Sequence, residues 1–137
     1  GNNEKETSNL KNVLTLKSVI SQIHTIEKGE TVGYNRAFKA VSTVKTATIP
    51  IGHADGISRQ FSNGVGYLYI NNKKAPIIGN VCMDMIMVNI SDIDCNEGDE
   101  VVVYKNQEHI EALSKAIHTI PYELLTSISQ RVRRMLK

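Results

Sequence analysis

The chain has 137 residues, which is enough for one domain around a single hydrophobic core. Hydrophobic residues make up 41% and charged residues 22%, as in ordinary soluble globular proteins, and a net charge of +2 gives no indication of a nucleic-acid partner. No apolar run approaches the roughly 20 residues of a membrane-spanning helix, so we expect no membrane partner. Two cysteines without a CxxC pair exclude a disulfide-rich scaffold and predict free thiols in a reducing cytoplasm, with no metal site.

The first half of the chain opens with a polar stretch and continues as strands and turns. Residues 1–9 lack hydrophobic periodicity, so we interpret them as a cloning remnant and linker, and the chain as part of a longer protein. β-Branched residues in partial alternation predict one long strand over 13–26 and another over 41–51. The remaining stretches favour a turn at 27–30, a loop at 32–38 and a long polar loop at 53–64.

The second half predicts a hairpin, two further strands and then short helices. Residues 66–70 and 74–78 flank Asn71-Asn72, a pair typical of tight hairpin turns. Strands are predicted over 85–90 and 100–104, and apolar residues at helical spacing predict a helix over 107–117. Pro121 is expected as the first residue of a second helix, before a final strand over 127–136. Six or seven strands with late, short helices predict a mostly-β barrel or sandwich.

These patterns alone indicate only a β-rich domain, but four segments carry a more specific signal. They are 27–34 (EKGETVGY), 49–56 (IPIGHADG), 75–84 (APIIGNVCMD) and 120–129 (IPYELLTSIS). In this order and spacing the sequence resembles the C-terminal domain of alanine racemase from residue 10 to the end, and the segment around Cys82-Met83-Asp84 is the most diagnostic. The resemblance implies a β-barrel with short late α-helices over 10–137.

The resemblance also implies a cofactor and partners that lie outside this chain. In that family pyridoxal 5'-phosphate is bound to a lysine of an N-terminal α/β barrel, and two subunits pair head to tail. Nothing in this sequence matches that barrel, so we expect no cofactor and no racemase activity in this chain alone. The expected partners are the barrel of the same enzyme, the barrel of a second subunit, and alanine. The implied role is the supply of D-alanine for peptidoglycan in a bacterial cytoplasm.

Three residues take direct roles if the resemblance holds. Racemisation needs a base on each face of the substrate, and Tyr34 stands in the position of the family's catalytic tyrosine. A phenol has a pKa near 10, so it would need positive charge from the partner's barrel to ionise. Met83 would bind the substrate carboxylate through its backbone N–H, and Tyr122 would bind the cofactor phosphate through its hydroxyl.

Four further residues fall on positions that narrow the access corridor in the family: His53, Arg59, Asn80 and Ile120. His53 stands where a tyrosine is usual, and Asn80 where an arginine is usual, so a polar gate is kept while one fixed charge is lost. These two variants are similar to racemases fused behind a muramoyl-peptide ligase.

Two other interpretations stay open at this point. The chain could be the β-domain of a related racemase or amino-acid decarboxylase that uses the same cofactor, or a β-barrel interaction module without catalysis. Turnover of alanine against serine, lysine and ornithine separates the first from alanine racemase. The second predicts that Tyr34→Phe costs no turnover in the full-length protein.

Overall fold

The fold is a curled antiparallel sheet with two helices at one end. The computed structural model describes residues 15–32 and 38–128. Seven strands follow the order β1-β9-β6-β7-β8-β5-β2, and a separate two-stranded sheet pairs β3 with β4. The bounds of the seven are β1 Leu16–Val19, β2 Gln22–Ile26, β5 Val44–Ile49, β6 Tyr67–Ile70, β7 Lys73–Ile78, β8 Ile86–Asn89 and β9 Glu100–Tyr104. This arrangement confirms the expected mostly-β barrel-like fold with late helices.

The single strand predicted over 13–26 is instead two strands at opposite edges of the sheet. β1 pairs with β9, whereas β2 pairs with β5. The change of partner falls at Ile20 and Ser21, whose amides donate to Asp99 O (3.0 Å) and Thr48 O (2.9 Å). Alternation along a strand reports which face is buried but not which neighbour is bonded, so the break left no mark in the sequence pattern.

The predicted hairpin between β6 and β7 is confirmed. The strands pair from Tyr67↔Pro76 to Ile70↔Lys73. Asn71 and Asn72 both have positive φ, at 52° and 64°, which is the conformation that a two-residue type I′ turn requires. Asparagine tolerates this region better than most residues, so the local sequence determines the register.

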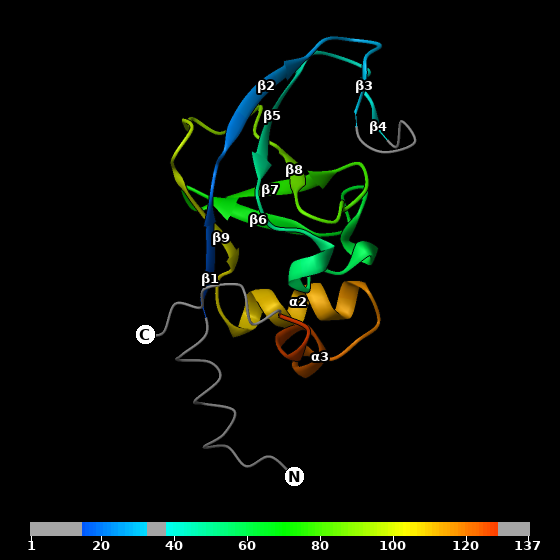
Figure 1. Ribbon diagram of the computed structural model, residues 1–137, viewed down its shortest axis with the longest axis vertical. Helices are drawn as coiled ribbons and strands as arrows, with labels where there is room; N and C mark the ends of the chain where they lie inside the picture. The colour runs from blue at the N-terminus through cyan, green and yellow to red at the C-terminus, as the bar shows by residue number, and fades with distance from the viewer. Residues whose placement is uncertain (1–14, 33–37, 129–137) are drawn as a thin grey trace.

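The region predicted as a loop at 32–38 contains short strands at both ends. β3 (Thr31–Val32) and β4 (Phe38–Lys39) pair with each other, and both lie at the far end of the β2–β5 ribbon from the helices (Figure 1). A small apolar cluster, separate from the main core, supports this hairpin. It consists of Ile26, Ala40, Val44 and Ile78, with Phe38 packed against them.

Two helices follow the last strand. α2 (Gln107–Ala116) begins at Asn106, whose side chain accepts a hydrogen bond from His109 N, and α3 (Pro121–Thr126) begins with Pro121 as predicted. Figure 1 shows both helices at the end of the barrel opposite β3 and β4. The final strand predicted over 127–136 is wrong at its start, because Ser127 ends α3 and Ile128 lies in a bend, and residues 129–136 lie outside the described residues.

The main core lies between the sheet and the helices. Leu16, Ile49, Val88 and Val101 are fully buried on the inner face, and Leu113 and Leu124 bring α2 and α3 onto it. Burial of this apolar surface is the chief stabilising term of the fold. The residues of interest lie on the loop between β7 and β8 and on the segment between β5 and β6.

Candidate functional site

The loop between β7 and β8 presents Met83 to solvent. Met83 is 51% exposed and therefore does not belong to the hydrophobic core. Its carbonyl accepts a hydrogen bond from Ala54 N (2.9 Å), and the carbonyl of Cys82 accepts one from His53 N (2.8 Å). The amide of Met83 donates to no acceptor within residues 15–32 and 38–128. An exposed, rigidly held N–H of this kind is a donor ready for an anionic ligand.

A short 3₁₀ turn, η2 (His53–Asp55), holds this loop from one side. The buried Asp55 carboxylate accepts from Gly52 N (2.9 Å) and closes the turn. Gly52 lies so close to the loop that a Cβ there would come within 2.7 Å of Met83 O and of Met85 N, and would also overlap Cys82 O. A glycine is therefore required for the close approach of the two backbones.

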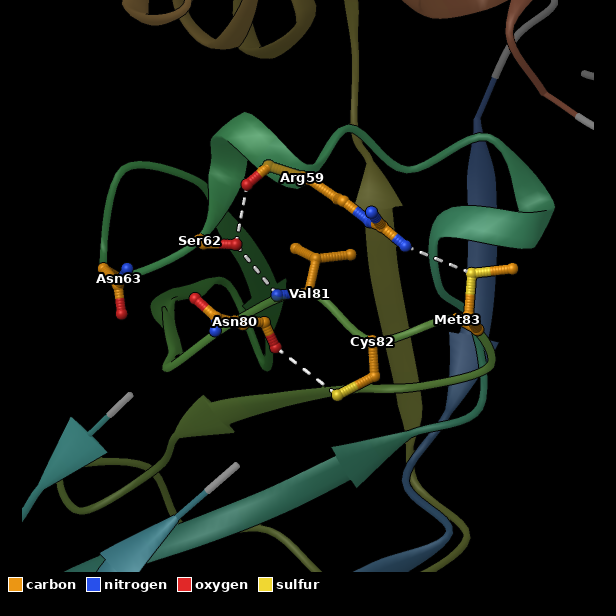
Figure 2. A pocket seen from close by; sticks show the side chains of 7 residues that line it. All are labelled: Arg59, Ser62, Asn63, Asn80, Val81, Cys82 and Met83. Carbon is orange, nitrogen blue, oxygen red and sulfur yellow. Dashed lines mark hydrogen bonds between the residues drawn. The ribbon is translucent and has the colours of Figure 1, made fainter. Parts of the chain in front are cut away.

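A second 3₁₀ turn, η3 (Arg59–Phe61), approaches the loop from the other side. Ser58 starts this turn by accepting a hydrogen bond from Gln60 N (3.1 Å). Between η3 and the β7–β8 loop lies an open pocket of about 730 Å³ (Figure 2). It is lined by Arg59, Ser62, Asn63, Asn80, Val81, Cys82 and Met83.

Arg59 brings positive charge to this pocket. Its side chain reaches across from η3 to Met83, where Nη2 lies 3.4 Å from the thioether sulfur (Figure 2). Arg59 is the one charged side chain among the described residues of the lining, and Asn63 and Asn80 add amide groups. A guanidinium beside a free backbone N–H and neutral amides is suited to a carboxylate.

His53 is held in one orientation at the rim of the site. Its Nδ1 lies 3.3 Å from the carbonyl oxygen of Ile57. A carbonyl can only accept, so Nδ1 carries the proton and donates it, which leaves Nε2 of the neutral ring as an acceptor. The histidine is exposed, and its backbone is fixed to Cys82.

Ile120 and Tyr122 lie at the start of α3 and are 58% and 60% exposed. The end of the same helix packs on the turn that follows η2, because a Cβ at Gly56 would overlap Ser127 O and come within 2.7 Å of Ile128 Cα. α3 and η2 are therefore neighbours, although neither Ile120 nor Tyr122 lines the pocket of Figure 2.

The structure thus brings together four of the seven predicted site residues: His53, Arg59, Asn80 and Met83 share the η2, η3 and β7–β8 loops. Tyr34 lies outside the described residues, between β3 and β4. Sequence reasoning missed Ser62, which joins η3 to Val81 through its side chain. Ser62 lies within the polar loop predicted over 53–64, and a polar pattern carries no information on a partner 19 residues away.

Within the described part of the chain, no group of histidine, cysteine or acidic side chains is arranged to hold a metal ion. Cys82 and Cys95 are free thiols. No helix of the described ranges is both long and apolar enough to cross a membrane.

Comparison with known proteins places this site in a family. Over residues 13–136 the sequence matches the family described as alanine racemase, C-terminal domain. The chain belongs to this family. This alanine racemase C-terminal domain is 37% identical over 140 residues to the alanine racemase of Helicobacter pylori strain J99, a match that covers 98% of this chain and 37% of that protein. It is 43% identical over 126 residues to the alanine racemase of Vesicomyosocius okutanii, covering 91% and 36%.

Solved structures agree with this assignment. The alanine racemase of Acinetobacter baumannii superposes with a TM-score of 0.84 at 32% identity, over 96% of this chain and 36% of that one. The alanine racemase of Bartonella henselae, solved with covalently bound pyridoxal phosphate, superposes with a TM-score of 0.81 at 37% identity, over 87% and 33%. The racemase domain described here therefore spans little more than a third of the length of such relatives.

Proposed function

We propose that this chain is the C-terminal domain of an enzyme that interconverts L- and D-alanine with pyridoxal phosphate, and that it completes the active site of a second subunit. The observation that carries the proposal is the Met83 amide, which has no acceptor among the described residues and lies on a loop that two 3₁₀ turns hold and whose Met83 side chain contacts Arg59. A backbone donor near a guanidinium is suited to the carboxylate of a small amino acid, and both lie within the residues that match the family.

In this proposal each residue acts at a different part of the substrate or cofactor. Met83 N–H binds the substrate carboxylate, and Tyr34 removes or returns the Cα proton on one face. His53, Arg59, Asn80 and Ile120 form the corridor through which alanine reaches the site. Pyridoxal phosphate, when bound to the barrel, supplies the electron sink that makes the Cα–H bond acidic.

Tyr122 fits a role toward the cofactor phosphate. Its side chain is 60% exposed, and its hydroxyl donates to no acceptor among the described residues. A neutral phenol is a donor suited to a phosphate oxygen, and its position on α3 keeps it outside the pocket that Met83 lines. We therefore propose that Tyr122 serves the barrel of its own subunit while Tyr34 and Met83 serve the partner's, in a homodimer of the bacterial cytoplasm.

The decisive experiment uses the full-length protein with Tyr34→Phe. We expect kcat for alanine racemisation to fall about 10²–10⁴-fold, because the phenol oxygen that transfers the proton is removed while the ring remains. Deuterium uptake at Cα in D₂O, followed separately from L- and D-alanine, should be impaired mainly from one enantiomer. Tyr69→Phe, on β6 and away from the site, is the matched control and should retain wild-type turnover.

Two results would contradict the proposal. Full turnover by the Tyr34→Phe variant would favour an interaction module or a different base. Preferential turnover of serine, lysine or ornithine by the wild-type protein would favour a related racemase or a decarboxylase.

A further inference from the structure

Ser62 joins the two walls of the pocket with one hydroxyl group. Its Oγ donates to Arg59 O (2.6 Å), and it accepts a hydrogen bond from Val81 N (2.8 Å). One wall is the η3 turn that carries Arg59, and the other is the segment that carries Val81 and, two residues later, Met83. Figure 2 shows Ser62 between them. The hydroxyl uses its one proton and one lone pair on two segments that are distant in the sequence.

The Ser62 hydrogen bond depends on a side chain, whereas the bonds between η2 and the loop join backbone atoms. The η2 turn holds Cys82 and Met83 by backbone hydrogen bonds from His53 and Ala54, which no substitution at those positions to a non-proline residue removes. A further backbone bond, Asn63 N to Gly79 O (2.8 Å), lies at the start of the loop. Two side-chain contacts join the Arg59 turn to the stretch between Asn80 and Met83 among the described residues: the Ser62 bond with Val81 N, and the contact of Arg59 Nη2 with the Met83 sulfur. Of these two, the Ser62 bond is the one that reaches a backbone amide.

We propose that Ser62 is a positioning residue, which keeps the Met83 amide, the proposed donor to the substrate carboxylate, at a fixed separation from the corridor residue Arg59. The inference rests on the proposed function and extends it to a residue that touches neither substrate nor cofactor. Val81 is buried, so without Oγ its N–H is left without an acceptor, and the segment must shift to regain one. Such a shift moves Met83 relative to Arg59, while the fold is kept by the backbone ties.

The consequence should appear in KM and not in kcat. The carboxylate is not a reacting group, so its contacts are equally strong in the ground state and in the transition state. Loosening these contacts weakens substrate binding and leaves the proton transfer by Tyr34 unchanged.

The test compares three variants in the full-length enzyme. For Ser62→Ala we expect KM for L- and D-alanine to rise about tenfold, with kcat within about twofold of wild type. Ser62→Thr keeps the hydroxyl and should restore KM. Ser58→Ala is the matched control, because Ser58 starts the same turn but its hydroxyl bonds, among the described residues, to Gln60 N and not to the Met83 loop, so KM should stay at the wild-type value.

Hydrogen exchange gives a readout that does not depend on turnover. The amide of Val81 should exchange faster in Ser62→Ala than in wild type, and at the wild-type rate in Ser62→Thr and Ser58→Ala. If Ser62→Ala does not fold, Ser62→Cys replaces it, with a weaker hydrogen bond and an intermediate KM.

Each outcome either supports or overturns the proposed role of Ser62. An unchanged KM in Ser62→Ala, an equal rise in Ser58→Ala, or failure of Ser62→Thr to restore KM would overturn the role of Ser62 while leaving alanine racemisation intact. A wild-type protein that does not racemise alanine would instead overturn the proposed function, so the two failures are distinguishable.

Discussion

Tyr104 is a core residue whose ring and hydroxyl group have opposite effects on stability. It is 1% exposed at the end of β9 and opposes Leu16 of β1. Its hydroxyl has no hydrogen-bond partner among residues 15–32 and 38–128, and burial raises the pKa of the phenol well above its ordinary value. The cavity beside it holds about 10 Å³ and has a mostly apolar lining, which is too little for a well-bonded water. Burial of the ring stabilises the folded state, whereas burial of the hydroxyl group without a hydrogen bond costs desolvation free energy.

Tyr104→Phe should therefore stabilise the domain. We expect the free energy of unfolding to rise by about 1 kcal/mol, because the ring is retained and the unsatisfied hydroxyl is removed. Urea denaturation followed by circular dichroism measures this change. A loss of stability of similar size would mean that the hydroxyl makes a bond in solution. Tyr69→Phe, on the half-buried side of β6, is the control and should be close to neutral.

At the scale of elements, the junction between η2 and the β7–β8 loop is a close contact between two backbones. Gly52 has an extended backbone that any residue can adopt, with φ of −151°. The requirement for glycine there is one of space, since three backbone atoms of the opposite loop lie within reach of a Cβ. The two loops cannot separate without breaking the bonds from His53 and Ala54.

Gly52→Ala should destabilise the domain by about 2–3 kcal/mol, because either the turn or the Met83 loop must move away. Gly64→Ala is the control for alanine at a glycine site: Gly64 has φ of 86° but nothing within 4 Å of its Cβ position, so only backbone strain of about 1 kcal/mol is expected. Thermal unfolding of both variants measures the difference. Equal losses would show that the loops are less tightly joined than described.

The elements also show which parts of the fold the sequence predicts. The β6–β7 hairpin and the start of α3 follow from Asn71-Asn72 and Pro121, whose conformational preferences act within a few residues. The division of 13–26 into β1 and β2 does not, because it depends on which strands lie nearby in space. The same limit applies to the site: its segments were predicted from a resemblance, but the Ser62 link depends on tertiary contact.

At the scale of the whole molecule, His109 connects the helical end to the barrel. It is 3% exposed; its Nδ1 accepts from Lys105 N (3.0 Å), and its Nε2 donates to Tyr67 O (3.2 Å). The ring also packs between Tyr67 and Tyr69. Burial is the main cause that lowers its pKa to about 4; the hydrogen bond to the Tyr67 carbonyl opposes this shift, and the charges of Lys105 and Lys74 add to it.

The stability of the whole domain should therefore fall in mild acid. The unfolded chain has a histidine pKa near 6.5 and binds the proton before the folded chain does, so stability is complete above about pH 6.5 and declines as pH falls toward 4. We expect a loss on the order of 2 kcal/mol from this group after allowance for solvent screening. Denaturation at pH 7 and pH 4.5 measures the loss, which His109→Gln should reduce. His24→Gln, an exposed change on β2, should leave it as it is.

The separation of β1 and β2 has a consequence for the order of events during synthesis. Leu16 of β1 pairs with Tyr104 of β9. β1 is synthesised before the other strands of this sheet, but its partner strand β9 is synthesised last. A nascent chain that has passed the Met83 loop but not β9 can form the β6–β7 and β7–β8 pairs, yet its sheet is open. Pairing between strands this far apart in the sequence is slow. We therefore expect the nascent domain to become resistant to proteolysis only after most of it has left the ribosome.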